Sequence, residues 1–212
     1  AMEQAVLRHG LPLAGVELAA QLARLAELAA VGRCLGLSAL AAVCSCLIAA
    51  NLVMAPVAHV TASVVAHLAV QPIADGTIRR RRDGRAQAAA ALALAALISL
   101  PISLLYYVTP ALLARLQLPD PVLLGAGEYM PTLVLAVAPG LLQAAALGYL
   151  RAWQRLPTAS LVIVATTLAY IWLLPRALSA GGLRGAAVAV AVVHAASLLS
   201  LLAFHRNAFR AR

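Results

Sequence analysis

A block of arginines between two long apolar stretches constrains this chain more than any other feature. Residues 79–85 carry five arginines in seven positions. Each of them would cost about 2.5–3.5 kcal/mol at the centre of a membrane helix, so the block must lie in water. Short, strongly positive loops stay on the cytoplasmic side of a membrane. A basic run could also bind nucleic acid, but long apolar flanks are atypical of such proteins, and we expect no nucleic-acid partner.

The composition indicates a membrane protein independently. Hydrophobic residues make up 64% of the chain and charged residues 11%, whereas about 25% of the residues of a soluble domain are charged. The sequence therefore predicts an all-α, polytopic membrane protein. All sixteen basic residues are Arg, and with the abundance of Ala and Leu this indicates a GC-rich coding bias, which favours the inner membrane of a bacterium. Three cysteines without a Cys-x-x-Cys pattern predict neither a disulfide nor a metal site.

Six apolar segments have about the length that a membrane helix requires, which is about 20 residues. The second exceeds the bilayer core, so we expect it to tilt, to kink at Pro56 or to protrude. The longest connection is expected at 109–128 and a glycine-rich turn at 175–184. We predict one transmembrane lobe, residues 1–212, with spans at about 11–31, 38–69, 86–108, 129–150, 158–174 and 185–204.

The arginines set the orientation of these spans. With alternating spans, eleven arginines fall on the side of the 79–85 block and four on the opposite side, and Arg24 remains inside the first span. The excess of positive charge marks the cytoplasmic side. We therefore expect a multi-pass protein with both termini in the cytoplasm.

Polar residues inside the first two spans are candidates for a transport pathway. Intramembrane ionisable groups face a bundle interior or a water-filled cavity, and those of the first segment, at 17, 24 and 27, fall within a narrow arc of a helix. An interfacial amphipathic helix or a cleaved signal peptide would be an alternative for this segment. The second span carries Asn51, His59, Thr61, Ser63 and His67, which we expect to face inward, with the histidines packed and hydrogen-bonded. The cavity-lining candidates are Glu17, Arg24, Asn51 and His59.

No enzyme signature is present. The chain lacks a Gly-x-Ser-x-Gly elbow, a P-loop and a His-Glu-x-x-His motif, and its seven acidic residues are scattered. We predict that the protein is not an enzyme and binds no cofactor or metal. Without a nucleotide site, transport would be secondary or would depend on a partner chain. Helices broken by Pro and Gly together with a buried acid are typical of secondary transporters.

Four stretches resemble the multidrug and toxic compound extrusion (MATE) family. Residues 26–43, with Glu27 followed by Val31-Gly32-Arg33-Cys34-Leu35-Gly36, are similar to that family's junction between its first two helices. The other stretches resemble the approach to the fourth helix, the loop between the fourth and fifth helices and the entry to the sixth helix. They lie at 120–130, 148–157 and 182–189.

The resemblance implies a function and a partner. MATE transporters have two six-helix halves, and this chain resembles the N-terminal half, so a second six-helix lobe or a homodimer is the expected partner. The implied activity is efflux of organic, often cationic, small molecules coupled to H⁺ or Na⁺, and Glu27 falls on the family's first-helix acid. Burial disfavours the charged form of a carboxylate, which makes Glu27 the ion-coupling candidate.

Two departures keep alternatives open. The fifth helix, where the family often has Asn or Asp, reads Thr166-Thr167-Leu168-Ala169-Tyr170, and the second helix ends in Gln71-Pro72-Ile73-Ala74-Asp75. Arg24 lies three residues before Glu27, and an ion pair between them would make the acid structural. One alternative is a lipid-linked oligosaccharide flippase of the same wider superfamily, for which Arg24 is the intramembrane cation. Another is a truncated lobe that does not transport.

Overall fold

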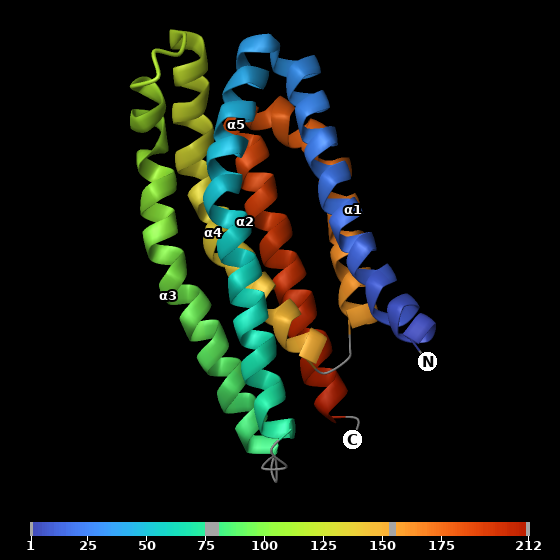
Figure 1. Cartoon of the computed structure of the whole chain (residues 1–212). Coiled ribbons are helices and arrows are strands. Elements are labelled where there is room, and N and C mark those ends of the chain that lie inside the picture. Colours follow the sequence, from blue (N-terminus) through green and yellow to red (C-terminus); the bar gives the residue numbers. More distant parts are fainter. Residues whose placement is uncertain (1, 75–80, 153–155, 211–212) are drawn as a thin grey trace.

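The described part of the chain folds into five helices. The structure is a computed structural model that describes residues 2–74, 81–152 and 156–210. Hydrocarbon offers the backbone no hydrogen-bond partners, so apolar segments satisfy their own N–H and C=O groups by forming helices. Figure 1 shows the helices as a bundle of long, roughly aligned rods. They are α1 (Met2–Leu35), α2 (Leu37–Ala74), α3 (Arg81–Ala114), α4 (Asp120–Ala152) and α5 (Leu156–Arg210).

Helix α5 consists of two arms joined at Gly182. The backbone angles there, φ 57° and ψ −139°, belong to a region that only glycine readily adopts, and Figure 1 shows the chain turning back at this point. A side chain at Gly185 would collide with the backbone oxygen of Ala177, so the arms are in close contact beside the turn. The expected spans at 158–174 and 185–204 are these two arms. The expected glycine-rich turn at 175–184 is found at Gly182, but its bounds are too wide, because the first arm continues through Pro175 to Gly181.

The expected long connection at 109–128 is also wrong. Helix α3 continues to Ala114 and α4 begins at Asp120, which leaves only residues 115–119 between them. An acidic residue in the first turn favours the start of a helix, and Asp120 occupies that position. Hydropathy marks the part of a helix that lies in hydrocarbon, whereas the helices themselves extend beyond it.

Four helices of the described residues are long and apolar enough to cross a membrane. Helix α1, which carries Glu17, Arg24 and Glu27, does not meet that standard. Four such helices make the protein a multi-pass membrane protein. The last of them contains both arms of α5, and six separate spans remain a prediction. The four segments are Leu37–His67, Ala89–Ala114, Asp120–Arg151 and Ala159–Phe204.

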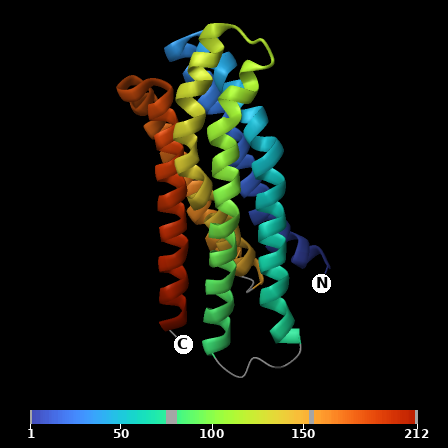
Figure 2. The same ribbon diagram turned by 90° about the vertical axis from the view of Figure 1, so that its left-hand side faces the viewer.

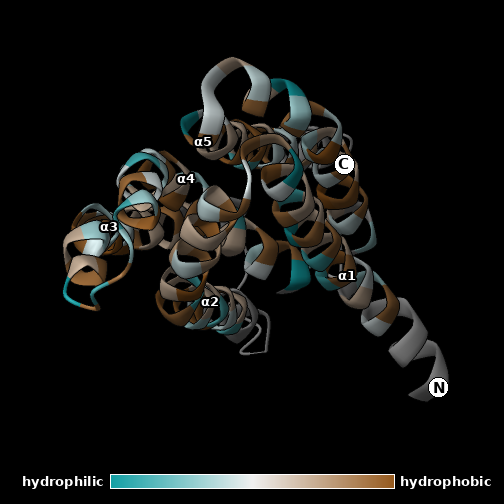
Figure 3. Cartoon of the chain, turned by 90° about the horizontal axis from the view of Figure 1, so that it is seen from above, coloured by the Kyte–Doolittle hydropathy of each residue, from teal (hydrophilic) through white to brown (hydrophobic). Residues whose placement is uncertain are grey.

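Helix α4 is the central element of the bundle. It packs against α2, α3 and α5, while α1 packs mainly against α5, and Figure 3 shows α4 among these neighbours when the bundle is viewed from above. Its side chains Tyr129, Met130 and Leu141 are completely buried. Many large apolar side chains remain exposed on the outside of the lobe, among them Leu52, Leu97 and Leu104, as expected of a surface that contacts lipid.

The start of α1, the end of α5 and the ends of α2 and α3 that flank residues 75–80 lie at the same end of the bundle (Figures 1 and 2). We call it the arginine end. The opposite end holds the connection at Gly36, where φ is 88°, the connection at 115–119 and the turn at Gly182. Parts of the expected basic segments lie outside the described residues, including Arg79, Arg80, Trp153, Arg155 and Arg212.

Candidate functional site

Glu27 is a buried carboxylate held by a tyrosine of another helix. Its residue surface is only 4% exposed, and the Tyr129 hydroxyl donates a hydrogen bond of 2.6 Å to its Oε1. Helix α1 therefore brings the acid to the central helix α4, where Tyr129 is itself fully buried. A carboxylate in such a position needs hydrogen-bond donors or a counter-ion whenever it is charged. Tyr129 supplies one donor.

A second tyrosine lies beside the same carboxylate. Tyr170 of α5 is 5% exposed, and its hydroxyl lies next to Glu27 without reaching hydrogen-bond geometry. This hydroxyl has no hydrogen-bond partner among the described residues. Three helices thus contribute to one polar group, which we call the Glu27 cluster (Glu27, Tyr129 and Tyr170). The cluster offers the oxygen atoms of one acid and two phenols.

Arg24 does not pair with Glu27. The two residues are three positions apart on α1, but they are not among the ion pairs that the described side chains form within 4.0 Å. Arg24 is half-buried. The geometry of the cluster therefore gives Glu27 a hydrogen bond from a phenol in place of an ion pair.

The remaining predicted residues lie outside the Glu27 cluster. Glu17 and His59 are exposed on the surface of the lobe, and Asn51 is half-buried. The expectation that the histidines of α2 pack inside is wrong, because His59 and His67 are both exposed. Ala62, an alanine, occupies the point where α2 meets Gly148 of α4, whereas the histidines lie where their side chains reach the outer surface of the lobe.

Sequence reasoning missed a second polar group, which is partly buried. Nδ1 of His194 in α5 lies 2.6 Å from Oε1 of Gln143 in α4. Ser197, one helical turn further along α5, is 1% exposed and its hydroxyl has no partner among the described residues. A histidine in an otherwise apolar sixth segment was the available signal. Gln143 lies fourteen residues after Tyr129, about 21 Å along α4, so this pair is remote from the Glu27 cluster.

The described side chains offer no metal centre. No three His, Cys, Asp or Glu residues come together among them in an arrangement that could hold an ion. Two further ionisable contacts lie near the end opposite the arginine end, where Arg184 lies 3.9 Å from Glu128 on the surface and Arg176 stacks over the exposed ring of Trp172. Such pairings suit the interface between hydrocarbon and water.

Comparison with known proteins places the fold. No family model matches the sequence, and no curated protein matches it. Solved structures do match, among them two transporters. One is a MOP superfamily transporter from Pyrococcus furiosus, described as having a binding pocket of reversed polarity that suggests a different function, with 20% identity and a TM-score of 0.79. The other is the outward-facing conformation of a multidrug resistance MATE family transporter of the MOP superfamily, with 20% identity and a TM-score of 0.80.

The extent of the match is the same in both cases. Each alignment covers 93% of this chain and 43% of the neighbour, so the chain spans less than half the length of the transporters that it matches. At 20% identity the likeness shows the fold. The chain is therefore a multi-pass helical membrane protein that has the fold of MOP superfamily transporters over part of their length.

Proposed function

We propose that this chain is the N-terminal lobe of a secondary transporter that exports organic, often cationic, compounds in exchange for H⁺ or Na⁺. One observation carries the proposal: a buried carboxylate, Glu27, lies in the interior of a lobe that has the fold of MOP transporters. Transport driven by an ion gradient needs a group that binds the ion and releases it. The Glu27 cluster supplies such a group and holds it with one hydrogen bond from Tyr129.

The transport pathway would lie outside this lobe. Glu17 and His59 are exposed on its surface, with Arg24 and Asn51 half-buried on the same two helices, and polar groups in lipid would be costly. A second lobe packed against α1 and α2 would shelter them in a shared cavity. The expected partners are therefore the bilayer, a small-molecule substrate and a second six-helix lobe, which would be a C-terminal half or another copy of this chain.

A flippase for lipid-linked oligosaccharides is the second candidate. Such a protein would need a cationic cavity, and Arg24 is the one arginine within the first expected span. Arg24 is only half-buried and leaves Glu27 unpaired, so it is available to an anionic group entering from the side of the lobe. A neutral substitution at Arg24 would abolish flippase activity, whereas cation efflux would survive it.

We expect transport only when a second lobe is present. The full chain should be reconstituted into proteoliposomes alone and joined to a C-terminal six-helix lobe, and the flux of an organic cation should be measured under an imposed H⁺ or Na⁺ gradient. The joined protein should show gradient-driven flux and the strictly monomeric chain should not. Robust flux from the monomer would refute the need for a second lobe, and no flux from either form would favour a non-transporting lobe.

We expect the arginine end to face the cytoplasm of a bacterial inner membrane. Single cysteines should be placed at Thr77 and at Gln117 in a protein whose three native cysteines have been replaced. An impermeant thiol reagent added to intact cells should label the cysteine at 117, because residues 115–119 connect α3 and α4 at the opposite end, and should leave the one at 77 unlabelled. The reverse pattern would invert the topology.

A further inference from the structure

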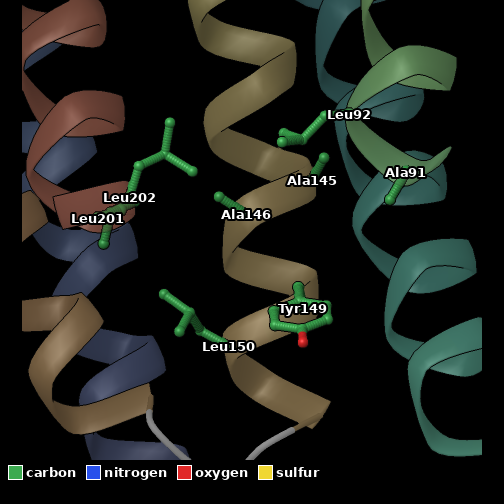
Figure 4. A pocket seen from close by; sticks show the side chains of 8 residues that line it. All are labelled: Ala91, Leu92, Ala145, Ala146, Tyr149, Leu150, Leu201 and Leu202. Atoms are coloured by element: carbon green, nitrogen blue, oxygen red, sulfur yellow. The ribbon is translucent and has the colours of Figure 1, made fainter. Parts of the chain in front are cut away.

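A small apolar pocket lies near the arginine end, between α3, α4 and the second arm of α5 (Figure 4). It has a volume of about 30 Å³ and is partly open to the outside. Ala91 of α3, Ala145 and Ala146 of α4 and Leu201 of α5 form its walls. Leu202 also lines it and is 37% exposed, so the pocket opens onto the apolar outer surface of the lobe, where lipid chains lie.

All three helices that line this pocket carry arginines in their next turns toward the arginine end. Arg151 directly follows Leu150, which lines the pocket. Arg85 precedes Ala91 by six residues, and Arg206 follows Leu202 by four. At 1.5 Å per residue these separations are about 9 Å and about 6 Å along the helix axes. The further arginines in these helical turns are Arg81, Arg82 and Arg210.

The arginines near the pocket are not balanced by acids. Six arginines lie in these turns of α3, α4 and α5, whereas the acidic residue there is Asp83 alone. Arg151 is exposed. Arginines of this kind sit at the depth of the lipid headgroups, because their charge cannot enter hydrocarbon. The exposed Arg151 thus directly follows an apolar pocket that opens toward the hydrocarbon, and the sequence places five further arginines in the nearby helical turns.

Tyr149 marks the boundary between these two environments. Its ring lines the pocket, and its hydroxyl points toward the arginine end in Figure 4. Tyrosine suits such a position because its ring is apolar and its hydroxyl is polar. The order along the helix axes is therefore apolar wall, phenol and then arginine, which is the order of chain, glycerol and phosphate in a phospholipid.

We propose that this pocket is a binding site for an anionic phospholipid, with part of an acyl chain between α3, α4 and α5 and the phosphate among the arginines. Basic clusters beside membrane helices attract anionic headgroups, each basic residue contributing about fivefold in affinity. The apolar pocket would fix the position of one lipid molecule, because an acyl-chain segment that enters it gains van der Waals contacts on three sides. Free phosphate would gain nothing from the apolar walls.

The test is lipid binding by the full chain in detergent, followed by native mass spectrometry. Phosphatidylglycerol and phosphatidylcholine with the same acyl chains are the probes. Phosphatidylglycerol should bind at least about fivefold more tightly. Ala146→Phe fills the pocket, and Leu202→Trp blocks it from the partly exposed rim and is the milder change for folding. Both should weaken phosphatidylglycerol binding by on the order of tenfold, the factor for about two buried methylene groups.

Charge and control variants separate the possible sources of binding. Arg151→Gln should weaken the binding of phosphatidylglycerol by about fivefold and leave that of phosphatidylcholine unchanged. Ala90→Phe, at an exposed position of α3 next to Ala91, and Arg115→Gln, at the opposite end, should change neither. Equal binding of the two lipids would overturn the proposal. So would unchanged binding in both pocket variants, or full competition by inorganic phosphate, which would indicate a free-anion site.

Discussion

Replacing Glu27 with Gln should abolish H⁺- or Na⁺-driven efflux by the complete two-lobe transporter while leaving membrane insertion and substrate binding largely intact. Glutamine has almost the same volume, and its side-chain oxygen can still accept the hydrogen bond that Tyr129 donates at 2.6 Å. The substitution therefore removes the ionisable group and keeps the packing. Flux under an imposed gradient and equilibrium binding of a labelled substrate are the two measurements.

Matched variants distinguish coupling from a structural role. Glu128→Gln changes the same residue type at an exposed position of α4, outside the Glu27 cluster, and it should leave coupling in place. Tyr129→Phe keeps the buried ring and removes the donor, so it should weaken coupling less than Glu27→Gln does. Normal transport by Glu27→Gln would show that the carboxylate is not the coupling group. If Glu27→Gln fails to fold and neutralising Arg24 restores it, the acid serves an ion pair with Arg24, which would contradict the separation of these two side chains in the structure.

The sequence predicted this acid, but it could not predict the residues around it. Glu27 stood out because an acid in a membrane span is costly and because it falls in a stretch that resembles a transporter family. Tyr129 and Tyr170 were part of stretches compared with that family, yet nothing in their spacing placed them beside Glu27. Their contact depends on how α1, α4 and α5 pack, and a hydrophobicity pattern fixes the exposed and buried faces of a helix without naming its neighbour.

The fold class was accessible from the sequence, whereas the helix ends were not. Long apolar segments separated by arginines predicted an all-helical membrane protein, and the structure agrees. The expected loop at 109–128 was wrong because helical backbone continues past the apolar core, ending at Ala114 and resuming at Asp120. The turn expected at 175–184 was predicted too long, because Pro175 does not end the helix. The helix ends at Gly182, whose backbone angles only glycine readily adopts.

The inward placement predicted for the polar residues of α2 holds for Thr61, which is 3% exposed, and is wrong for His59, Ser63 and His67, which are exposed. Polar side chains in a span were expected to avoid lipid by facing the bundle. Within this lobe the close contact between α2 and α4 at Ala62 and Gly148 leaves no room for an imidazole, and His59 is exposed. Polar groups on the outer surface of α2 would still avoid lipid if a second lobe covered that surface. The structure of one lobe does not contain such a partner.

Gly148→Val should prevent the lobe from folding, the largest structural effect that we expect from a single substitution. Gly148 lies where α4 crosses α2. A Cβ at this position would be 2.9 Å from both the carbonyl carbon and Cα of Ala62 and closer still to its oxygen. These are backbone atoms of a helix, so they cannot rotate away as a side chain would. Small residues allow such close crossings between membrane helices.

Substitutions of increasing size at position 148 should lower the stability of the lobe step by step. Gly148→Ala forces the two helices apart and should lower the free energy of unfolding by about 1–3 kcal/mol, the usual cost of overpacking, and Gly148→Val should cost more. Gly127→Ala is the matched control, because it lies in the same helix and a Cβ there meets nothing within 4 Å. It should be neutral or stabilise the lobe by up to about 1 kcal/mol. The stability of each variant is measured by thermal unfolding and by the folded yield in detergent. Equal stability of Gly148→Ala and Gly127→Ala would contradict the close contact between α2 and α4.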